Sequence, residues 1–198
     1  MPEPHTSEES ASPTAPVQLG RGLTLLVGGA RSGKSDLAVA LGKAFAGDVT
    51  FAATAEGGDD DMAQRIRRHQ GDRPAGWDLI EAPLLDASII DDVDPSAMLI
   101  IDCITLLVSN LMFADKTDEQ IDQHASVLSH VLVSRRAPTI VISNEVGLGV
   151  VPDNELSRRY RDLLGRYNNQ LSSRAEMALF VAAGRVMPLR PLTLEISE

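Results

Sequence analysis

The chain has 198 residues and carries 18 basic against 28 acidic side chains, giving a formal net charge of −10. An acidic chain is poorly matched to phosphate backbones, so general nucleic-acid binding is excluded. The single cysteine, Cys103, excludes an intrachain disulfide framework. No apolar run approaches the roughly 18 residues of a transmembrane helix, and no secretory signal is visible. We therefore expect a cytoplasmic protein with no membrane span and no nucleic-acid partner.

Residues 1–20 are rich in proline, serine, threonine and glutamate, and they contain almost no large apolar side chains. Such a segment buries too little apolar surface to offset the entropy lost on ordering. We expect a disordered N-terminal tail at 1–20, followed by one domain at 21–198, because the remaining length suits a single core.

The domain alternates short apolar runs with longer amphipathic stretches. The apolar runs predict strands at 23–27, 49–53, 78–81, 98–101, 139–142 and 177–183, with 185–189 as a final edge strand. The amphipathic stretches predict helices at 35–45, 59–70, 118–134 and 154–173. Strands that alternate with helices predict an α/β fold of three layers around a mostly parallel sheet.

The turn after the first predicted strand has a recognisable phosphate-binding pattern. It reads Gly28, Gly29, Ala30, Arg31, Ser32, Gly33, Lys34 and Ser35, which matches G-x-x-x-x-G-K-[ST] in full. Backbone N–H groups of such a loop cradle phosphate oxygens, and the helix N-terminus adds positive charge. We expect Lys34 to act catalytically on the β- and γ-phosphates and Ser35 to bind Mg²⁺. The fold class is therefore P-loop NTPase-like.

A P-loop requires an acidic partner, and Asp102 closes the apolar run 98–101. We expect it at the end of a neighbouring strand, where its carboxylate binds Mg²⁺ directly or through water. The alternative is that Asp102 only caps the helix that follows.

His69 lies on a predicted polar helix among Arg65, Arg68 and Arg73. A neutral imidazole can attack phosphorus, and nearby cations would keep it unprotonated and stabilise the developing charge. The alternative is a solvated surface histidine. The other three histidines, one in the tail and two on the helix at 118–134, are expected at the surface. So are the arginines between 158 and 174.

Residues 143–152 read Ser-Asn-Glu-Val-Gly-Leu-Gly-Val-Val-Pro, between a predicted strand and a predicted helix. Ligands of open α/β sheets bind at the carboxyl ends of the strands, so we expect this stretch at the same edge as the P-loop. It is either a substrate loop or a plain strand-to-helix turn.

Several stretches together resemble the bifunctional adenosylcobinamide kinase / adenosylcobinamide-phosphate guanylyltransferase family of cobalamin synthesis. The resemblance rests on GGARSGKS (28–35), ATA (53–55), D-M-x-x-R-I-x-x-H-x-x-x-R-P-x-x-W (61–77), Glu81, DCIT (102–105), Asn110, SNEVGxGVVP (143–152) and GRYN (165–168). It covers residues 23–190. The chain departs from the pattern at Asp61, where glutamate is frequent, and at Arg68, where some members have a second histidine.

The resemblance implies a homotrimeric enzyme with two activities. One phosphorylates the aminopropanol hydroxyl of adenosylcobinamide with ATP or GTP. The other transfers GMP from GTP to adenosylcobinamide phosphate through a covalent GMP–histidine intermediate. By position, His69 is the guanylylated residue. The nucleotide site implied beyond the P-loop comprises Ala53, Thr54, Ala55, Gln70, Gly71, Asp72, Arg73, Glu81 and Asp102.

Two other functions are kept open on the residues alone. The first is a monofunctional small-molecule kinase in which His69 is only structural. The second is a nucleotide-binding regulatory or assembly protein with little turnover. Both would retain the P-loop, so that motif does not separate them from the bifunctional enzyme.

Overall fold

The computed structural model describes residues 19–55 and 74–191, and its strands form one seven-stranded sheet in the order β3-β2-β4-β5-β1-β6-β7. The first six strands in chain order run parallel, and β7 is antiparallel to β6. The strands are β1 Gly22–Gly28, β2 Val49–Ala53, β3 Asp78–Glu81, β4 Met98–Asp102, β5 Pro138–Asn144, β6 Met177–Ala182 and β7 Arg185–Leu189. The helices are α1 Lys34–Ala44, α3 Ala87–Asp91, α4 Ile104–Phe113, α5 Asp118–Ser134 and α6 Glu155–Arg174.

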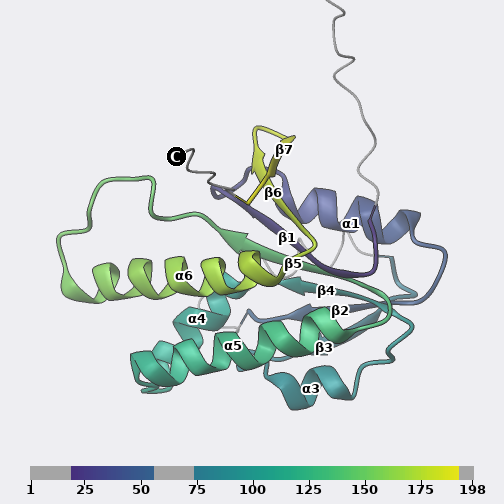
Figure 1. The fold of residues 1–198 in the computed structure, drawn as a ribbon, viewed down its shortest axis with the longest axis horizontal. Coiled ribbons are helices and arrows are strands. Elements are labelled where there is room, and N and C mark those ends of the chain that lie inside the picture. The colour runs from purple at the N-terminus through teal and green to yellow at the C-terminus, as the bar shows by residue number, and fades with distance from the viewer. Residues whose placement is uncertain (1–18, 56–73, 192–198) are drawn as a thin grey trace, which may run out of the picture.

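The sheet is covered on both faces, as Figure 1 shows: α1 packs on one face and α4, α5 and α6 pack on the other. Successive strand residues alternate between the two cores. In β1, Leu25 packs with the larger helical layer and Leu26 with the α1 layer, as strand geometry requires. The predicted three-layer α/β fold with a mostly parallel sheet is confirmed.

Two of the helices were not predicted. In α4 the apolar residues surround nearly the whole helix, so the sequence lacks the one-sided periodicity by which amphipathic helices are recognised. The helix α3 has only five residues and begins at Asp86, whose carboxylate accepts hydrogen bonds from two backbone N–H groups. The predicted helix 59–70 lies outside the described residues, as does nearly all of the predicted tail. Within 19–55 and 74–191, no helix has the length and apolar character to span a bilayer.

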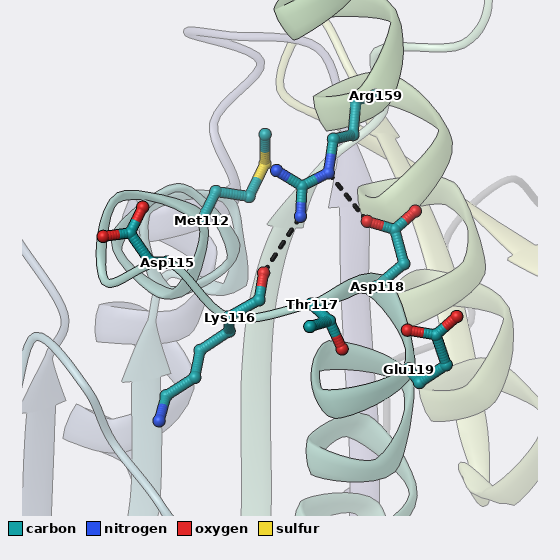
Figure 2. Close-up of a pocket in the computed structure, with 7 residues that line it drawn as sticks. All are labelled: Met112, Asp115, Lys116, Thr117, Asp118, Glu119 and Arg159. Atoms are coloured by element: carbon teal, nitrogen blue, oxygen red, sulfur yellow. Dashed lines mark hydrogen bonds and ion pairs between the residues drawn. The ribbon is translucent and has the colours of Figure 1, made fainter.

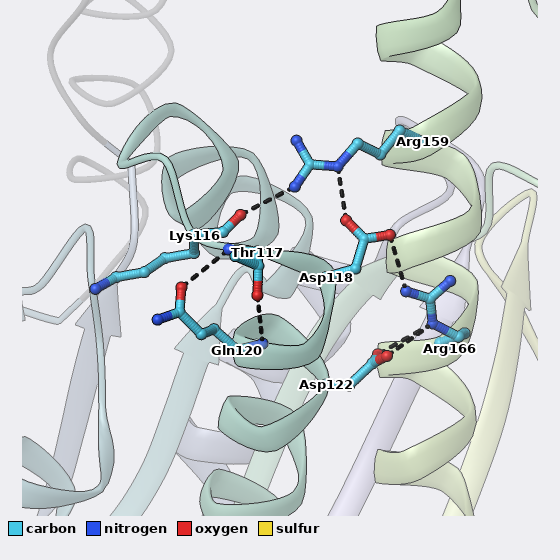
Figure 3. Close-up of polar contacts among 7 residues, drawn as sticks. All are labelled: Lys116, Thr117, Asp118, Gln120, Asp122, Arg159 and Arg166. Carbon is cyan, nitrogen blue, oxygen red and sulfur yellow. Dashed lines mark hydrogen bonds and ion pairs between the residues drawn. The ribbon is translucent and has the colours of Figure 1, made fainter.

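Arginines of α6 join this helix to the start of α5, as Figure 3 shows. Arg159 donates to Asp118 at 2.7 Å, and Arg166 contacts both Asp118 at 3.4 Å and Asp122 at 3.1 Å. The start of α5 is fixed by a capping box of Thr117 and Gln120. The Arg159 and Arg166 side chains are 36% and 44% exposed, so both reach the surface as predicted, and each ion pair contributes little by itself.

His124 was expected at the surface, and that expectation was wrong. Its Nδ1 lies 2.9 Å from the Tyr167 hydroxyl, and its Nε2 lies 3.0 Å from the Leu85 carbonyl oxygen. A carbonyl only accepts, so in the neutral ring Nε2–H donates to Leu85 and Nδ1 accepts from Tyr167. The imidazole thereby joins α5, α6 and the segment after β3. Burial lowers the pKa of His124 below its usual value, and the Leu85 carbonyl partly opposes that shift.

We predict that His124 makes folding sensitive to acid. Because the pKa of His124 is lower in the folded than in the unfolded chain, the unfolded chain takes up a proton first as the pH falls through about 6.5. The free energy of unfolding should therefore fall between about pH 7 and about pH 5, by at most about 1.4 kcal/mol per pH unit. Chemical denaturation of His124→Gln should show a flatter pH dependence. The matched control, His130→Gln on the exposed side of the same helix, should retain the wild-type slope; equal slopes in both variants would contradict this assignment.

Candidate nucleotide site

The turn from β1 into α1 depends on two glycines for different reasons. A Cβ on Gly28 would lie 2.1 Å from the carbonyl oxygen of Val181, so β1 and β6 approach too closely for any side chain there. Gly33 has a φ of 101°, in the left-handed region that favours glycine. The N–H of Gly184 donates to the Ser32 carbonyl at 2.8 Å. The turn is therefore held against the β6–β7 hairpin.

The N-terminus of α1 is suited to an anion. Its N-cap is Gly33, and among the described residues no side chain caps its first-turn N–H groups. These groups and the helix dipole attract phosphate. The ammonium of Lys34 lies over the same turn, donating to the carbonyls of Gly28 at 3.0 Å and Gly29 at 2.7 Å. The P-loop lysine and the helix N-terminus therefore lie together at this turn, as the motif predicts.

Ser35 and Asp102 meet although they start from strands that are not neighbours. Asp102 ends β4, Ser35 follows β1 at the start of α1, and β5 lies between the two strands. The Ser35 hydroxyl donates to Oδ2 of Asp102 at 2.9 Å. We expected Asp102 on a strand next to β1, and that detail was wrong: β1 pairs with β5 and β6, whereas β4 pairs with β2 and β5. The first turn of α1 spans the gap. Burial lowers the pKa of Lys34, and the Asp102 carboxylate partly offsets that effect.

The Ser35–Asp102 pair has the donor chemistry of a magnesium site. Both groups present oxygen, the ligand type that Mg²⁺ prefers. No group of three or more histidine, cysteine, aspartate or glutamate side chains in the described part of the chain could form an all-protein metal cage. Mg²⁺ in nucleotide enzymes takes one or two protein oxygens and completes its shell with phosphate and water. The residues present therefore fit this ion.

Three strand ends meet in one row beside this pair. The sheet register places Ala53 of β2 opposite Glu81 of β3 on one side and Asp102 of β4 on the other. Thr54 and Ala55 follow directly from β2. The structure therefore brings the predicted residues of β2, β3 and β4 to the carboxyl edge of the sheet. Their contact with nucleotide stays a prediction.

Thr54 ties the ends of β2 and β4 together. Its N–H donates to the Asp102 carbonyl at 3.1 Å, and its hydroxyl donates to the Cys103 carbonyl at 2.6 Å and accepts from the Cys103 N–H at 2.8 Å. The Asn110 amide then donates to the carbonyls of Thr54 and Pro83, each at 2.9 Å. The sequence analysis gave Asn110 no role; the available signal was an amide in a mostly apolar stretch.

The exit of β5 is braced from α6. The Ser143 hydroxyl donates to Oδ1 of Asn168 at 2.6 Å, and the amide nitrogen of Asn168 donates to the Asn144 carbonyl at 3.0 Å. The N–H of Glu145 donates to the Gly28 carbonyl at 3.0 Å. The stretch 143–152 therefore begins beside the P-loop, as predicted.

Five of the predicted site residues fall in 56–73, outside the described residues. They are His69, Gln70, Gly71, Asp72 and Arg73. The arginines at 65 and 68 lie in the same range.

An open depression of about 430 Å³ lies elsewhere, at the turn from α4 into α5 (Figure 2). Its lining is Met112, Asp115, Lys116, Thr117, Asp118, Glu119 and Arg159. None of the predicted nucleotide-site residues within 19–55 and 74–191 lines it. Its described lining has three carboxylates and two cations, which is unfavourable for phosphate.

We predict that Thr54 stabilises the strand ends through its hydroxyl. Thr54→Val leaves the Cys103 N–H without its acceptor, so the free energy of unfolding should fall by about 1–3 kcal/mol. Thr139 is the matched control, because it is also fully buried but its hydroxyl has no hydrogen-bond partner among the described residues. Thr139→Val should leave stability unchanged or raise it. Urea denaturation followed by circular dichroism measures both; equal losses would contradict the role of Thr54.

Solved structures with the same layering share little sequence with this chain. A Pyrococcus horikoshii OT3 protein, from the structural study of PH0250, superposes with a TM-score of 0.53 at 8% identity, covering 86% of this chain and 87% of that one. A prototypical ATPase from the type III secretion system of pathogenic bacteria superposes with a TM-score of 0.50 at 11% identity, covering 80% of this chain and 50% of that one. At these identities the likeness concerns the fold alone.

Comparison at the sequence level is far more specific. The bifunctional adenosylcobalamin biosynthesis protein CobP of Pseudomonas aeruginosa is 41% identical over 167 residues, covering 84% of this chain and 96% of its own. The bifunctional adenosylcobalamin biosynthesis proteins CobU of Salmonella typhimurium and Escherichia coli are 38% and 36% identical, each over 82% of this chain and 96% of their own. The family described as cobinamide kinase / cobinamide phosphate guanyltransferase matches residues 24–189, and the chain belongs to this family.

Proposed function

We propose that the protein phosphorylates the aminopropanol hydroxyl of adenosylcobinamide and then transfers GMP from GTP to the resulting phosphate, giving adenosylcobinamide-GDP. The observation that carries the proposal is the Ser35–Asp102 contact at 2.9 Å beside the buried Lys34. In a chain of this family, that arrangement supports nucleoside-triphosphate chemistry at the P-loop.

The kinase step needs positioning and charge more than covalent chemistry. First-turn N–H groups of α1 and the Lys34 ammonium would hold the phosphates of ATP or GTP. The substrate hydroxyl oxygen attacks the γ-phosphorus and releases its proton to water, the bond to the bridging oxygen breaks, and the nucleoside diphosphate leaves. Mg²⁺, held by Ser35 and Asp102, would neutralise charge on the phosphate oxygens.

The transferase step would proceed through His69. The neutral imidazole nitrogen attacks the α-phosphorus of GTP, and pyrophosphate leaves. A phosphate oxygen of adenosylcobinamide phosphate then attacks the same phosphorus, the P–N bond breaks, and His69 is regenerated. Covalent catalysis of this kind divides one difficult transfer into two easier ones. The proposal rests on the position of His69 in the family motif and on the arginines around it in the sequence.

We also propose that the enzyme works in the cytoplasm as a homotrimer. The composition supports the cytoplasmic location, and the family resemblance supports the homotrimer. Sedimentation velocity of the purified chain measures the oligomeric state directly.

We predict that two labels separate the two activities. With GTP labelled at the α-phosphate, the wild type should acquire acid-labile, base-stable label on the protein, and His69→Ala should acquire none. With label at the γ-phosphate, His69→Ala should still phosphorylate adenosylcobinamide. Lys34→Ala should lose about a hundredfold or more of the kinase rate, because it removes a charge that acts on the phosphates.

His130→Ala is the matched control, since His130 is exposed on α5, and it should retain both activities. Covalent label that persists in His69→Ala would overturn the assignment of the nucleophile. Transfer of the γ-phosphate without α-label in the wild type would indicate a monofunctional kinase. Binding of GTP without either transfer would indicate a regulatory protein.

A further inference from the structure

Four exposed apolar side chains lie close together in the sequence, in the connection between β5 and α6. Leu148, Val150, Val151 and Leu156 are 81%, 95%, 60% and 54% exposed. Figure 1 shows this connection projecting beyond the sheet on the side where β5 ends. Scattered single apolar residues on a surface need no explanation, but a cluster of this kind indicates a binding surface.

The base of this connection is fixed while its tip is open. Asn168 holds Ser143 and the Asn144 carbonyl, and Val146 packs against the main core. Beyond that point the chain is open: within the described part of the chain, a Cβ added at Gly149 would meet no atom within 4 Å. The apolar tip is therefore an accessible surface whose base is fixed.

The connection starts at the nucleotide site. The Glu145 N–H donates to the carbonyl of Gly28, the first residue of the P-loop, at 3.0 Å. Only a few residues separate Glu145 from Leu148. A substrate that delivers a hydroxyl to the γ-phosphate through a short arm must keep its bulk near this edge of the sheet.

The patch is too small to be a stable protein interface by itself. Such interfaces bury about 800 Å² on each partner and use about 20–30 residues a side. The four apolar residues here lie within a nine-residue stretch, 148–156. Its extent suits one face of a large, partly apolar small molecule.

We propose that residues 148–156 form the binding surface for the corrin ring of the cobinamide substrate, an inference that rests on the proposed function. A corrin carries methyl groups and amide-bearing arms at its edge, and one arm ends in the aminopropanol hydroxyl. The methyl groups pack on Leu148, Val150 and Val151. The exposed backbone at Gly149 pairs with the amides. The hydroxyl arm then extends along the connection toward the P-loop.

The test compares two double variants of the full chain. L148S/V150S removes apolar surface from the tip without touching the P-loop. V127S/V133S removes two valines of α5 that are 43% and 40% exposed and lie away from the tip, and it serves as the control. Adenosylcobinamide binding is measured by equilibrium dialysis with absorbance detection, GTP binding by calorimetry, and oligomeric state by sedimentation velocity.

We expect L148S/V150S to bind adenosylcobinamide about tenfold more weakly, the equivalent of about 1.4 kcal/mol, with unchanged GTP affinity and sedimentation. V127S/V133S should match the wild type in all three measurements. If the wild type binds adenosylcobinamide and L148S/V150S binds it equally well, the inference alone is wrong. If L148S/V150S changes the oligomeric state while corrinoid affinity persists, the surface covers another copy of the chain and the inference is wrong. If the wild type binds GTP but no adenosylcobinamide, the proposed function fails together with the inference.

Discussion

The site depends on one contact across the sheet, the hydrogen bond from Ser35 to Asp102. These residues belong to α1 and β4, and β5 separates β4 from the strand that leads into α1. The contact forms because α1 packs over the middle of the sheet, with Ala38 and Gly42 buried against it. A bulkier residue at Gly42 would meet the Trp77 ring, its Cβ lying only 2.5 Å from it. The close packing of α1 on the sheet thus determines where the Ser35 and Asp102 oxygens meet.

The helices on the opposite face hold the strand ends on which this contact is built. Asn110 of α4 fastens the exits of β2 and β3, and Asn168 of α6 fastens the exit of β5. Both are amides that donate to backbone carbonyls at or just beyond the ends of strands. Backbone carbonyls that are buried without a hydrogen-bond donor cost free energy. Pairing them makes the carboxyl edge a rigid platform.

The segment after β5 has a fixed first part and an exposed second part. Its first residues are hydrogen-bonded or packed into the core, and its next residues present leucine and valine to solvent. A segment whose base is already fixed has less ordering entropy to lose on binding. The same strand end contacts Gly28, so under the proposed function the position of a bulky substrate would be coupled to the position of the phosphates.

The sequence by itself determined the fold class, the P-loop and most of the regular elements, because strand runs, amphipathic faces and glycine spacing are local properties. It also determined the family, through motifs whose order and spacing extend along the chain. Only the tertiary structure decided that β5 separates Asp102 from β1, that His124 is half-buried between helices, and that Asn110 and Asn168 brace strand ends. Strand order and long-range hydrogen bonds arise from packing between distant segments. The local pattern of a sequence does not indicate which distant segments pack together.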